Sequence, residues 1–315
     1  MLGRIAGIAG RLFLAAGILI LLFAAYQIWG TWLIEAHTQN HLRQELTTEL
    51  PPGAAARAER IAQAPKVTPP SPTSKPPQAA PTTAPPAAGA PVGIIQIPTI
   101  GLDQVVVEGV GTPQLRDGPG HYPGTPLPGQ AGNSAIAGHR TTYGHPFYDL
   151  NAVPPGSRVV LTTPQGIFVY AADATTVVSP SDTSVLAAST GAHLTLTTCN
   201  PRYSASTRLV LHATLVHSTL FATRHQRPVT APGKVPTTPA STRTVEATAL
   251  AGNGNGGWGP AILWGLGVVA LAAGIWLVAR RFGHRWIVYS VGALALLVVL
   301  FFFYSAITPL LPASV

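Results

Sequence analysis

Residues 194–201 have the sequence LTLTTCNP, and the fold of the chain is decided around them. The alternation of Leu and Thr predicts a β-strand, because successive side chains of a strand point to opposite faces. The strand should end at Cys199, since Pro201 has no amide hydrogen for pairing within a sheet. Nine residues further on, Arg208 begins another apolar run. If the two strands pair through the loop between them, Arg208 lies near Cys199.

Outward from this strand, short runs rich in Val, Ile, Leu and Thr alternate with Pro, Gly, Asn or Asp. Such runs predict β-strands, and no run here has a long helical period. Many short strands with frequent turns predict a β-barrel or sandwich. In the last run, Leu209, Leu211, Ala213 and Leu215 share one face, as expected for a strand that covers a core. The predicted strands cover residues 93–97, 104–108, 158–162, 167–172, 193–198 and 207–216.

Composition indicates what surrounds this β-domain. Charged residues are 10% of the 315-residue chain, against about 25% in ordinary soluble domains, and the chain contains 31 prolines. This combination predicts membrane segments joined to extended linkers. The net charge of +8 does not indicate nucleic-acid binding, because residues 93–217 contain five Arg, no Lys and six acidic residues. The basic excess lies outside the domain, and no nucleic-acid partner is expected.

Three uncharged stretches are long enough to cross a bilayer core of about 30 Å. Arg4 and Arg11 precede the first, and a basic turn separates the other two. Arginine marks the cytoplasmic side, so the flanks predict a multi-pass protein of the cell membrane with an extracellular middle domain. A cleavable signal peptide is the alternative for the first stretch, although its apolar core is usually about 7–15 residues. A buried helical hairpin of a soluble protein is the alternative for the last two.

Two linkers complete the predicted organisation. Ten prolines lie in residues 64–91, and such a segment is a semi-rigid spacer that buries too little apolar surface to fold. The predicted segments are a cytoplasmic N-terminus (1–11), a transmembrane helix (12–34), a juxtamembrane segment with a short helix (35–63), a Pro/Ala-rich linker (64–92), the catalytic domain (93–217), a flexible linker (218–257), a transmembrane helix (258–279), a basic cytoplasmic turn (280–285), a third transmembrane helix (286–307) and an external tail (308–315).

The candidate chemistry centres on Cys199, the single cysteine of the chain. A lone thiol is ordinarily a buried structural residue, but a neighbouring guanidinium can stabilise a thiolate or a developing oxyanion. A proton carrier is also needed, and His139 follows the short apolar run 134–138. Spacing alone does not distinguish His139 from the other histidines of the domain, which are His121, His145, His193, His212 and His217.

Four motifs together resemble the sortase family. They are IPTIGL at 97–102, GPGHYPGT at 118–125, GHR at 138–140 and TLTTC at 195–199, the last followed by Arg208. The AGHRTTYG stretch at 137–144 is similar to the class E sortases of actinobacteria. The resemblance extends over about 40% of the chain and implies an eight-stranded β-barrel. It also implies that Cys199, His139 and Arg208 match the family's catalytic residues.

The implied activity is that of a cysteine transpeptidase, related to thiol proteases, which anchors surface proteins to the cell wall. Such an enzyme cleaves a Thr–Gly bond in a C-terminal sorting signal like LAXTG or LPXTG and transfers the acyl group to an amine. The implied partners are surface proteins with that signal and an amine from a cell-wall precursor or a pilin. The resemblance gives Tyr143 a part in preferring Ala at the second signal position. Thr198 is a substrate-binding candidate through its backbone or hydroxyl.

Other readings stay open at this point. C-terminal spans also occur in pilus-building sortases, so a pilin-polymerising enzyme is one alternative, and an inactive surface β-barrel scaffold is another. A papain-like peptidase would place Cys before His in the chain. An L,D-transpeptidase motif resembles Ser-x-Gly-Cys-x-Arg, which residues 198–201 do not match. No acidic cluster has the density of a calcium loop, so neither a metal nor a cofactor is expected.

Overall fold

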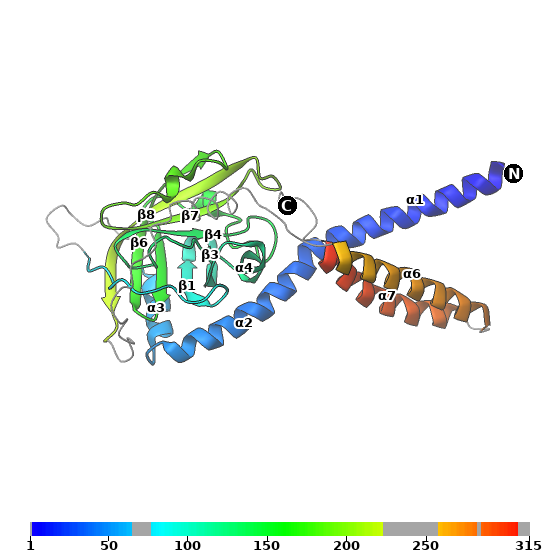
Figure 1. The fold of residues 1–315 in the computed structure, drawn as a ribbon, viewed down its shortest axis with the longest axis horizontal. Coiled ribbons are helices and arrows are strands. Elements are labelled where there is room, and N and C mark those ends of the chain that lie inside the picture. The colour runs from blue at the N-terminus through cyan, green and yellow to red at the C-terminus, as the bar shows by residue number, and fades with distance from the viewer. Residues whose placement is uncertain (1, 65–76, 223–257, 282–284, 308–315) are drawn as a thin grey trace. The chain divides into compact units, whose positions relative to one another are not determined.

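The computed structural model describes residues 2–64, 77–222, 258–281 and 285–307 (Figure 1). The chain divides into two compact units. One unit combines residues 1–33 with 254–313, and the other contains residues 34–253. The second unit holds all the β-strands and the candidate catalytic residues.

Eight strands close into a barrel in the order β1-β2-β3-β4-β7-β8-β6-β5 (Figure 1). All neighbouring pairs are antiparallel except β2 with β3 and β4 with β7, which are parallel. This confirms the eight-stranded sortase barrel that the resemblance implied. The strands are β1 (Pro91–Ile97), β2 (Leu102–Glu108), β3 (Gly120–His121), β4 (Gly132–Ala137), β5 (Arg158–Thr163), β6 (Gly166–Val178), β7 (Ala192–Asn200) and β8 (Thr207–Leu220).

The barrel core follows from the alternation of side chains along the strands. The predicted inward face of β8 is confirmed, since Leu209, Leu211, Ala213 and Leu215 all lie in the main apolar cluster. Two strands are missing from the sequence prediction: β3 has 2 residues, and β4 has 6 and contains most of the apolar run 134–138. Short helical segments occupy the connections, namely η2 (Pro98–Ile100), α4 (Thr112–Asp117), η3 (Leu150–Ala152) and η4 (Thr183–Leu186).

Two helices that precede the barrel in the chain pack against its outer surface. In α2 (Thr31–Glu49) and the residue after it, the side chains of Leu42, Leu46 and Leu50 cluster with apolar residues of β1 and β2. Their spacing of four places them on one face of a helix. In α3 (Ala54–Gln63), Ala58 and Ala62 pack on β5 and β6. The predicted juxtamembrane segment is therefore part of the folded unit, which the sequence prediction missed.

The predicted Pro/Ala-rich spacer is also partly folded. Residues 65–76 lie outside the described residues, but residues 77–90 run along the barrel. The amide of Ala80 donates to the Gly129 carbonyl at 2.7 Å, and the side-chain amide of Gln165 donates to the Pro81 carbonyl at 2.7 Å. The spacer prediction was wrong for these residues, because hydrogen bonds with the barrel hold the segment and Ala80 packs in the main apolar cluster.

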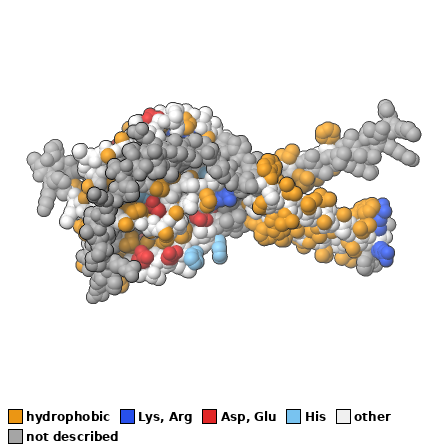
Figure 2. Space-filling view, in the orientation of Figure 1, with side chains coloured by type: hydrophobic (Ala, Val, Ile, Leu, Met, Phe, Trp, Pro, Cys, Tyr) orange, Lys and Arg blue, Asp and Glu red, His pale blue; other side chains and the backbone are white. Residues whose placement is uncertain are grey.

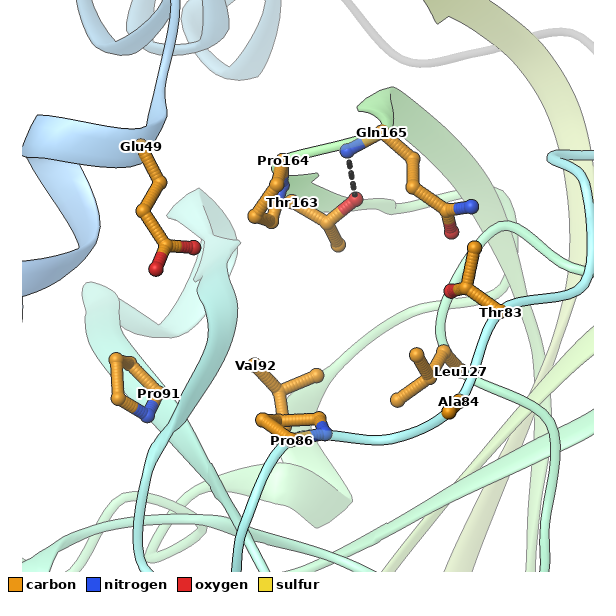
Figure 3. A pocket seen from close by; sticks show the side chains of 10 residues that line it. All are labelled: Glu49, Thr83, Ala84, Pro86, Pro91, Val92, Leu127, Thr163, Pro164 and Gln165. Atoms are coloured by element: carbon orange, nitrogen blue, oxygen red, sulfur yellow. Dashed lines mark hydrogen bonds between the residues drawn. The ribbon is translucent and has the colours of Figure 1, made fainter. Parts of the chain in front are cut away.

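A hollow of about 200 Å³ opens where the end of α2, residues 83–86 and the β5–β6 turn meet (Figure 3). Val92, Leu127 and several prolines line it. It lies at the end of the barrel away from Arg208, because Gly166 at the start of β6 pairs with Leu220 at the far end of β8. None of the candidate catalytic residues lines this hollow.

The other unit consists of helices. It contains α1 (Leu2–Ala25), a π-helical turn η1 (Tyr26–Gly30), α6 (Trp258–Arg281) and α7 (Arg285–Ile307). Two helices, Trp258–Arg281 and Trp286–Ile307, are long and apolar enough to cross a membrane, in agreement with the two predicted C-terminal spans. Figure 2 shows their hydrophobic surface, with basic side chains at one end. The predicted first span, 12–34, is helical, and its crossing of a membrane stays a prediction.

Candidate active site

Three adjacent strands bring the candidate catalytic residues together. Cys199 pairs directly with Arg208 across the antiparallel β7–β8 ladder, as the sequence predicted. On its other side β7 runs parallel to β4, with Ala137 opposite Thr197. His139 lies two residues past Ala137, and Cys199 lies two residues past Thr197. The register therefore places Cys199 beside Arg208 and brings the chain that leads to His139 to the same end of β7.

Cys199 and Arg208 share the outer face of the sheet. Residues 194 and 196 of β7 and residues 209 and 211 of β8 face the core, so the alternate residues face outward. The outer face is itself covered: the Tyr122 hydroxyl lies 3.0 Å from the Thr197 hydroxyl, and both residues are buried. The thiol is thus half-buried at the edge of a covered surface.

Two hydrogen bonds fix Gly138, the residue before His139, to β7. The amide of Gly138 donates to the Thr197 carbonyl at 3.0 Å, and the Thr198 hydroxyl donates to the Gly138 carbonyl at 2.7 Å. Thr198 is on the core-facing side of β7 and is buried. The sequence suggested that its hydroxyl binds substrate, but the structure commits that hydroxyl to positioning the residue before His139.

Opposing effects set the protonation of the thiol. Burial raises the pKa of Cys199, whereas the positive charges of Arg208 and Arg140 lower it. Burial is the larger effect, so the resting nucleophile is a thiol. Arg208 is only 7% exposed, and its guanidinium donates to the carbonyls of Ala205 and Thr207 at 2.9 and 3.1 Å. These contacts hold the cation at the β7–β8 turn, next to Cys199.

His139 has an uncharged imidazole at neutral pH. Burial lowers the pKa of His139 to about 4, and the nearby Arg116 guanidinium contributes to the decrease. Among the described residues, the buried His139 Nε2 atom has no hydrogen-bond partner. A pKa of about 4 keeps the ring neutral and makes it a weaker base than free imidazole, while the Nε2 atom stays available to exchange a proton with a bound group.

Tyr143 lies beside His139, as the motif implied. The two ring centroids are 5.2 Å apart with planes inclined by 37°, and the Arg116 guanidinium lies 5.6 Å from the Tyr143 ring centroid. Tyr143 is buried and has a left-handed backbone, with φ of 48°. Gly144 follows with φ of 70°. The histidine is therefore flanked by a tight turn and by α4, which carries Arg116.

The sequence reading missed Arg140 as a site residue, although it quoted the GHR motif. Arg140 is buried, and one guanidinium nitrogen donates to the Cys199 carbonyl at 3.2 Å and to Asn200 Oδ1 at 2.6 Å. The other terminal nitrogen donates to Asn151 Oδ1 at 2.8 Å. Arg140 therefore ties the end of β7 to the segment that follows His139. Its position directly after the histidine was the available signal.

The other candidate histidines lie elsewhere. His121 is buried, with Nδ1 2.8 Å from Glu108 Oε2, and so has a structural role. His212 pairs with Thr195, four residues before Cys199 along β7, and His217 pairs with Val169 on β6. His193 is the second residue of β7, and the His145 ring contacts Tyr148. In the described parts of the chain, no three His, Cys, Asp or Glu side chains form a metal-binding group.

A half-buried thiol paired with an arginine, at the strand end to which the chain brings a neutral histidine, is the arrangement expected of a cysteine-dependent enzyme, and comparison with known proteins agrees. Residues 95–216 match the family model of the sortase domain. The chain is 31% identical over 224 residues to sortase SrtE1 of Streptomyces coelicolor, which covers 66% of this chain and 56% of that protein. It is 32% identical over 114 residues to sortase D of Bacillus subtilis, with coverage of 36% and 56% respectively.

Among solved structures, sortase E from Streptomyces avermitilis is 38% identical, with a TM-score of 0.40. That match covers 43% of this chain and 93% of the solved chain. This chain thus spans about half the length of the first two curated relatives and nearly all of the solved sortase E domain. Residues 95–216 are therefore a domain of the sortase family.

Arg140 gives a first prediction. Arg140→Met keeps most of the side-chain stem but removes a positive charge that lowers the pKa of Cys199. The midpoint of the pH profile of Cys199 alkylation by iodoacetamide should therefore move to higher pH. Arg140→Lys should move it less, because the charge remains while the planar fork of donors is lost.

The matched control is Arg202→Ala. Arg202 forms a half-exposed ion pair with Asp149 at 2.6 Å, and Cys199 is not shifted by it. This variant should leave the alkylation midpoint unchanged. An unchanged midpoint in Arg140→Met would show that Arg140 has no electrostatic influence on the thiol.

Proposed function

We propose that this protein is a membrane-anchored sortase whose catalytic residues are Cys199, His139 and Arg208. It cleaves the Thr–Gly bond of a C-terminal sorting signal and transfers the acyl group to an amine. The proposal is supported by the strand register, which pairs Cys199 with Arg208 and brings the chain that leads to His139 alongside the end of β7. The substrates are surface proteins that carry the signal, and the acceptor is an amine of a cell-wall precursor.

In the first half of the reaction, the resting thiol and neutral imidazole act together. His139 takes the proton of Cys199 while the sulfur attacks the threonine carbonyl, so the thiolate forms as it is used. The carbonyl oxygen becomes negatively charged, and the Arg208 guanidinium stabilises it. The imidazolium then gives its proton to the leaving glycine nitrogen, the C–N bond breaks, and a thioester remains on Cys199.

The second half reverses these proton transfers. The incoming amine attacks the thioester carbonyl and gives a proton to neutral His139, while Arg208 again faces the oxyanion. When the C–S bond breaks, the imidazolium returns the proton to Cys199. An amide product and the resting enzyme result. Water in place of the amine would give hydrolysis, which makes the acceptor site as important as the nucleophile.

Tyr143 is the proposed selectivity residue. It is buried against the His139 ring and next to Arg116, so a sorting signal that reaches Cys199 passes close to it. The similarity of residues 137–144 to class E sortases supports a preference for LAXTG over LPXTG. Thr198 contributes indirectly, since its hydroxyl positions Gly138.

The function is tested by incubating the purified full-length chain with LAXTG and LPXTG peptides and a panel of amines, followed by mass spectrometry. We expect cleavage after Thr, an acyl-enzyme on Cys199 and ligated products. Cys199→Ala should remove all three, because the thiol supplies the nucleophile. His139→Ala should lower the rate at least about 100-fold. Turnover by Cys199→Ala above a few per cent of wild type would contradict the assignment.

Arg208 gives a separate kinetic prediction. Removing one oxyanion donor typically lowers the rate by about 10²–10³, or roughly 2.7–4 kcal/mol. Arg208→Ala should therefore lower kcat strongly with little change in KM, and Arg208→Lys should recover only part of the loss. Thermal melts of both variants provide the control. Near-normal kcat with a Tm lower by several degrees would mean that Arg208 only supports the β7–β8 turn.

The proposed topology places the catalytic domain (93–217) outside the cell, with residues 12–34, 258–279 and 286–307 as spans. Basic flanks at the first span and between the last two support this orientation. A reporter fused in the 281–285 turn should be cytoplasmic, and one fused after Val315 should be extracellular. A cytoplasmic C-terminal reporter would mean that one of the last two stretches does not span.

A further inference from the structure

Glu35 of α2 is buried behind the wall of the site. Its residue exposure is 3%, and its Oε1 atom has no hydrogen-bond partner among the described residues. The carboxyl occupies space that a side chain at position 144 would need, because a Cβ on Gly144 would lie 2.5 Å from Glu35 Oε2. Gly144 is therefore suited to this position both by its φ of 70° and by the carboxyl packed against it.

One turn further along α2, Gln39 fixes the helix to the barrel. Its side-chain amide forms the two hydrogen bonds that the backbone of a neighbouring strand would form with Val105. Oε1 accepts from the Val105 amide at 2.7 Å, and Nε2 donates to the Val105 carbonyl at 2.9 Å. The same nitrogen donates to the Asp117 carbonyl at 2.7 Å, at the end of α4. Glu35 therefore stands on a rigidly held helix face that also contacts α4.

Glu35 packs behind the Tyr143–Gly144 turn and α4. Both of these segments flank His139. Tyr143 and Gly144 form the left-handed turn whose tyrosine ring lies 5.2 Å from the His139 ring. α4 carries Arg116, next to Tyr143, and Asp117, whose charge acts on Glu35. A non-glycine residue with positive φ persists only where its surroundings support it. The Tyr143–Gly144 turn is supported by α2, because Glu35 packs against Gly144.

We propose that Glu35 is a positioning residue for the transpeptidation reaction, which holds the Tyr143–Gly144 turn against His139. The inference rests on the proposed function and extends the active site to the helix before the barrel. Glu35 is the first residue after the predicted span 12–34, so the helix that leaves the membrane segment would also shape the site. The role requires the shape of the side chain and a neutral polar end.

The neutral form is available near neutral pH. Burial and the charge of Asp117 raise the pKa of Glu35 to about 7. Glutamine has the same shape and stays uncharged, so it should replace Glu35 well. Alanine leaves a space beside Gly144 and frees the turn. These two substitutions therefore separate the packing of the side chain from its charge.

The experiment uses the full-length chain in detergent micelles with matched LAXTG and LPXTG peptides. Glu35→Ala should lower kcat about tenfold and reduce the preference between the two peptides, because Tyr143 and His139 lose their fixed positions. Glu35→Gln should keep both quantities within about twofold of wild type. The control is Arg43→Ala, on the same helix, which removes an exposed ion pair with Asp103 at 2.8 Å and leaves Glu35 in place. A lower folded fraction alone would not change the ratio between peptides.

A double-mutant cycle tests the contact directly. Gly144→Ala inserts a methyl group toward Glu35, so it should lower kcat and Tm more in the wild-type background than in Glu35→Ala. Unchanged kcat and preference in Glu35→Ala, or independent effects of the two substitutions, would overturn the inference. If wild type cleaves no peptide while the melts show coupling, the contact exists but the proposed function fails, and the positioning role fails with it.

Discussion

The active site depends on one constraint, the pairing of β7 with a parallel strand on one side and an antiparallel strand on the other. The parallel β4–β7 pair makes both chains leave the sheet in the same direction, so the residues after Ala137 and Thr197 emerge together. The antiparallel β7–β8 pair returns the chain through a short turn, so Arg208 begins where Cys199 ends. The segments that carry these three residues thereby meet at one strand end without a long loop to position them.

Burial and positive charge then determine the resting state of the chemistry. Burial raises the pKa of the Cys199 thiol and lowers that of the His139 imidazole, so both groups are held neutral. Two guanidinium groups oppose the first effect without overcoming it. In the proposed mechanism the thiolate and the imidazolium form only as a substrate accepts the sulfur, which limits side reactions of the resting thiol. The arginines are fixed by carbonyl and amide oxygens, so their charges need no rearrangement during the reaction.

The local parts of this arrangement were predictable from sequence, and the long-range parts were not. Alternating residues and Pro201 were enough to predict the β7–β8 pairing and the meeting of Cys199 with Arg208. His139 required the family resemblance, because the parallel pairing of β4 joins residues that no local pattern relates. Arg140 and the segment 77–90 were missed, since their contacts are hydrogen bonds to distant backbone and amide groups. For α2, Leu42 and Leu46 had the right spacing, but only the fold shows what they cover.

The docking of α2 also changes how the chain can be tethered. The proline-rich segment follows α2 and α3, and both helices already contact the barrel. That segment therefore does not separate the barrel from the predicted span 12–34, whatever its reach. Gln39 binds Val105 only five residues after that span, and a helix rises about 1.5 Å per residue. The predicted span 12–34 continues directly into α2 along the chain. The same helix carries Glu35, the proposed positioning residue, so one element would serve both the predicted anchor and the proposed site.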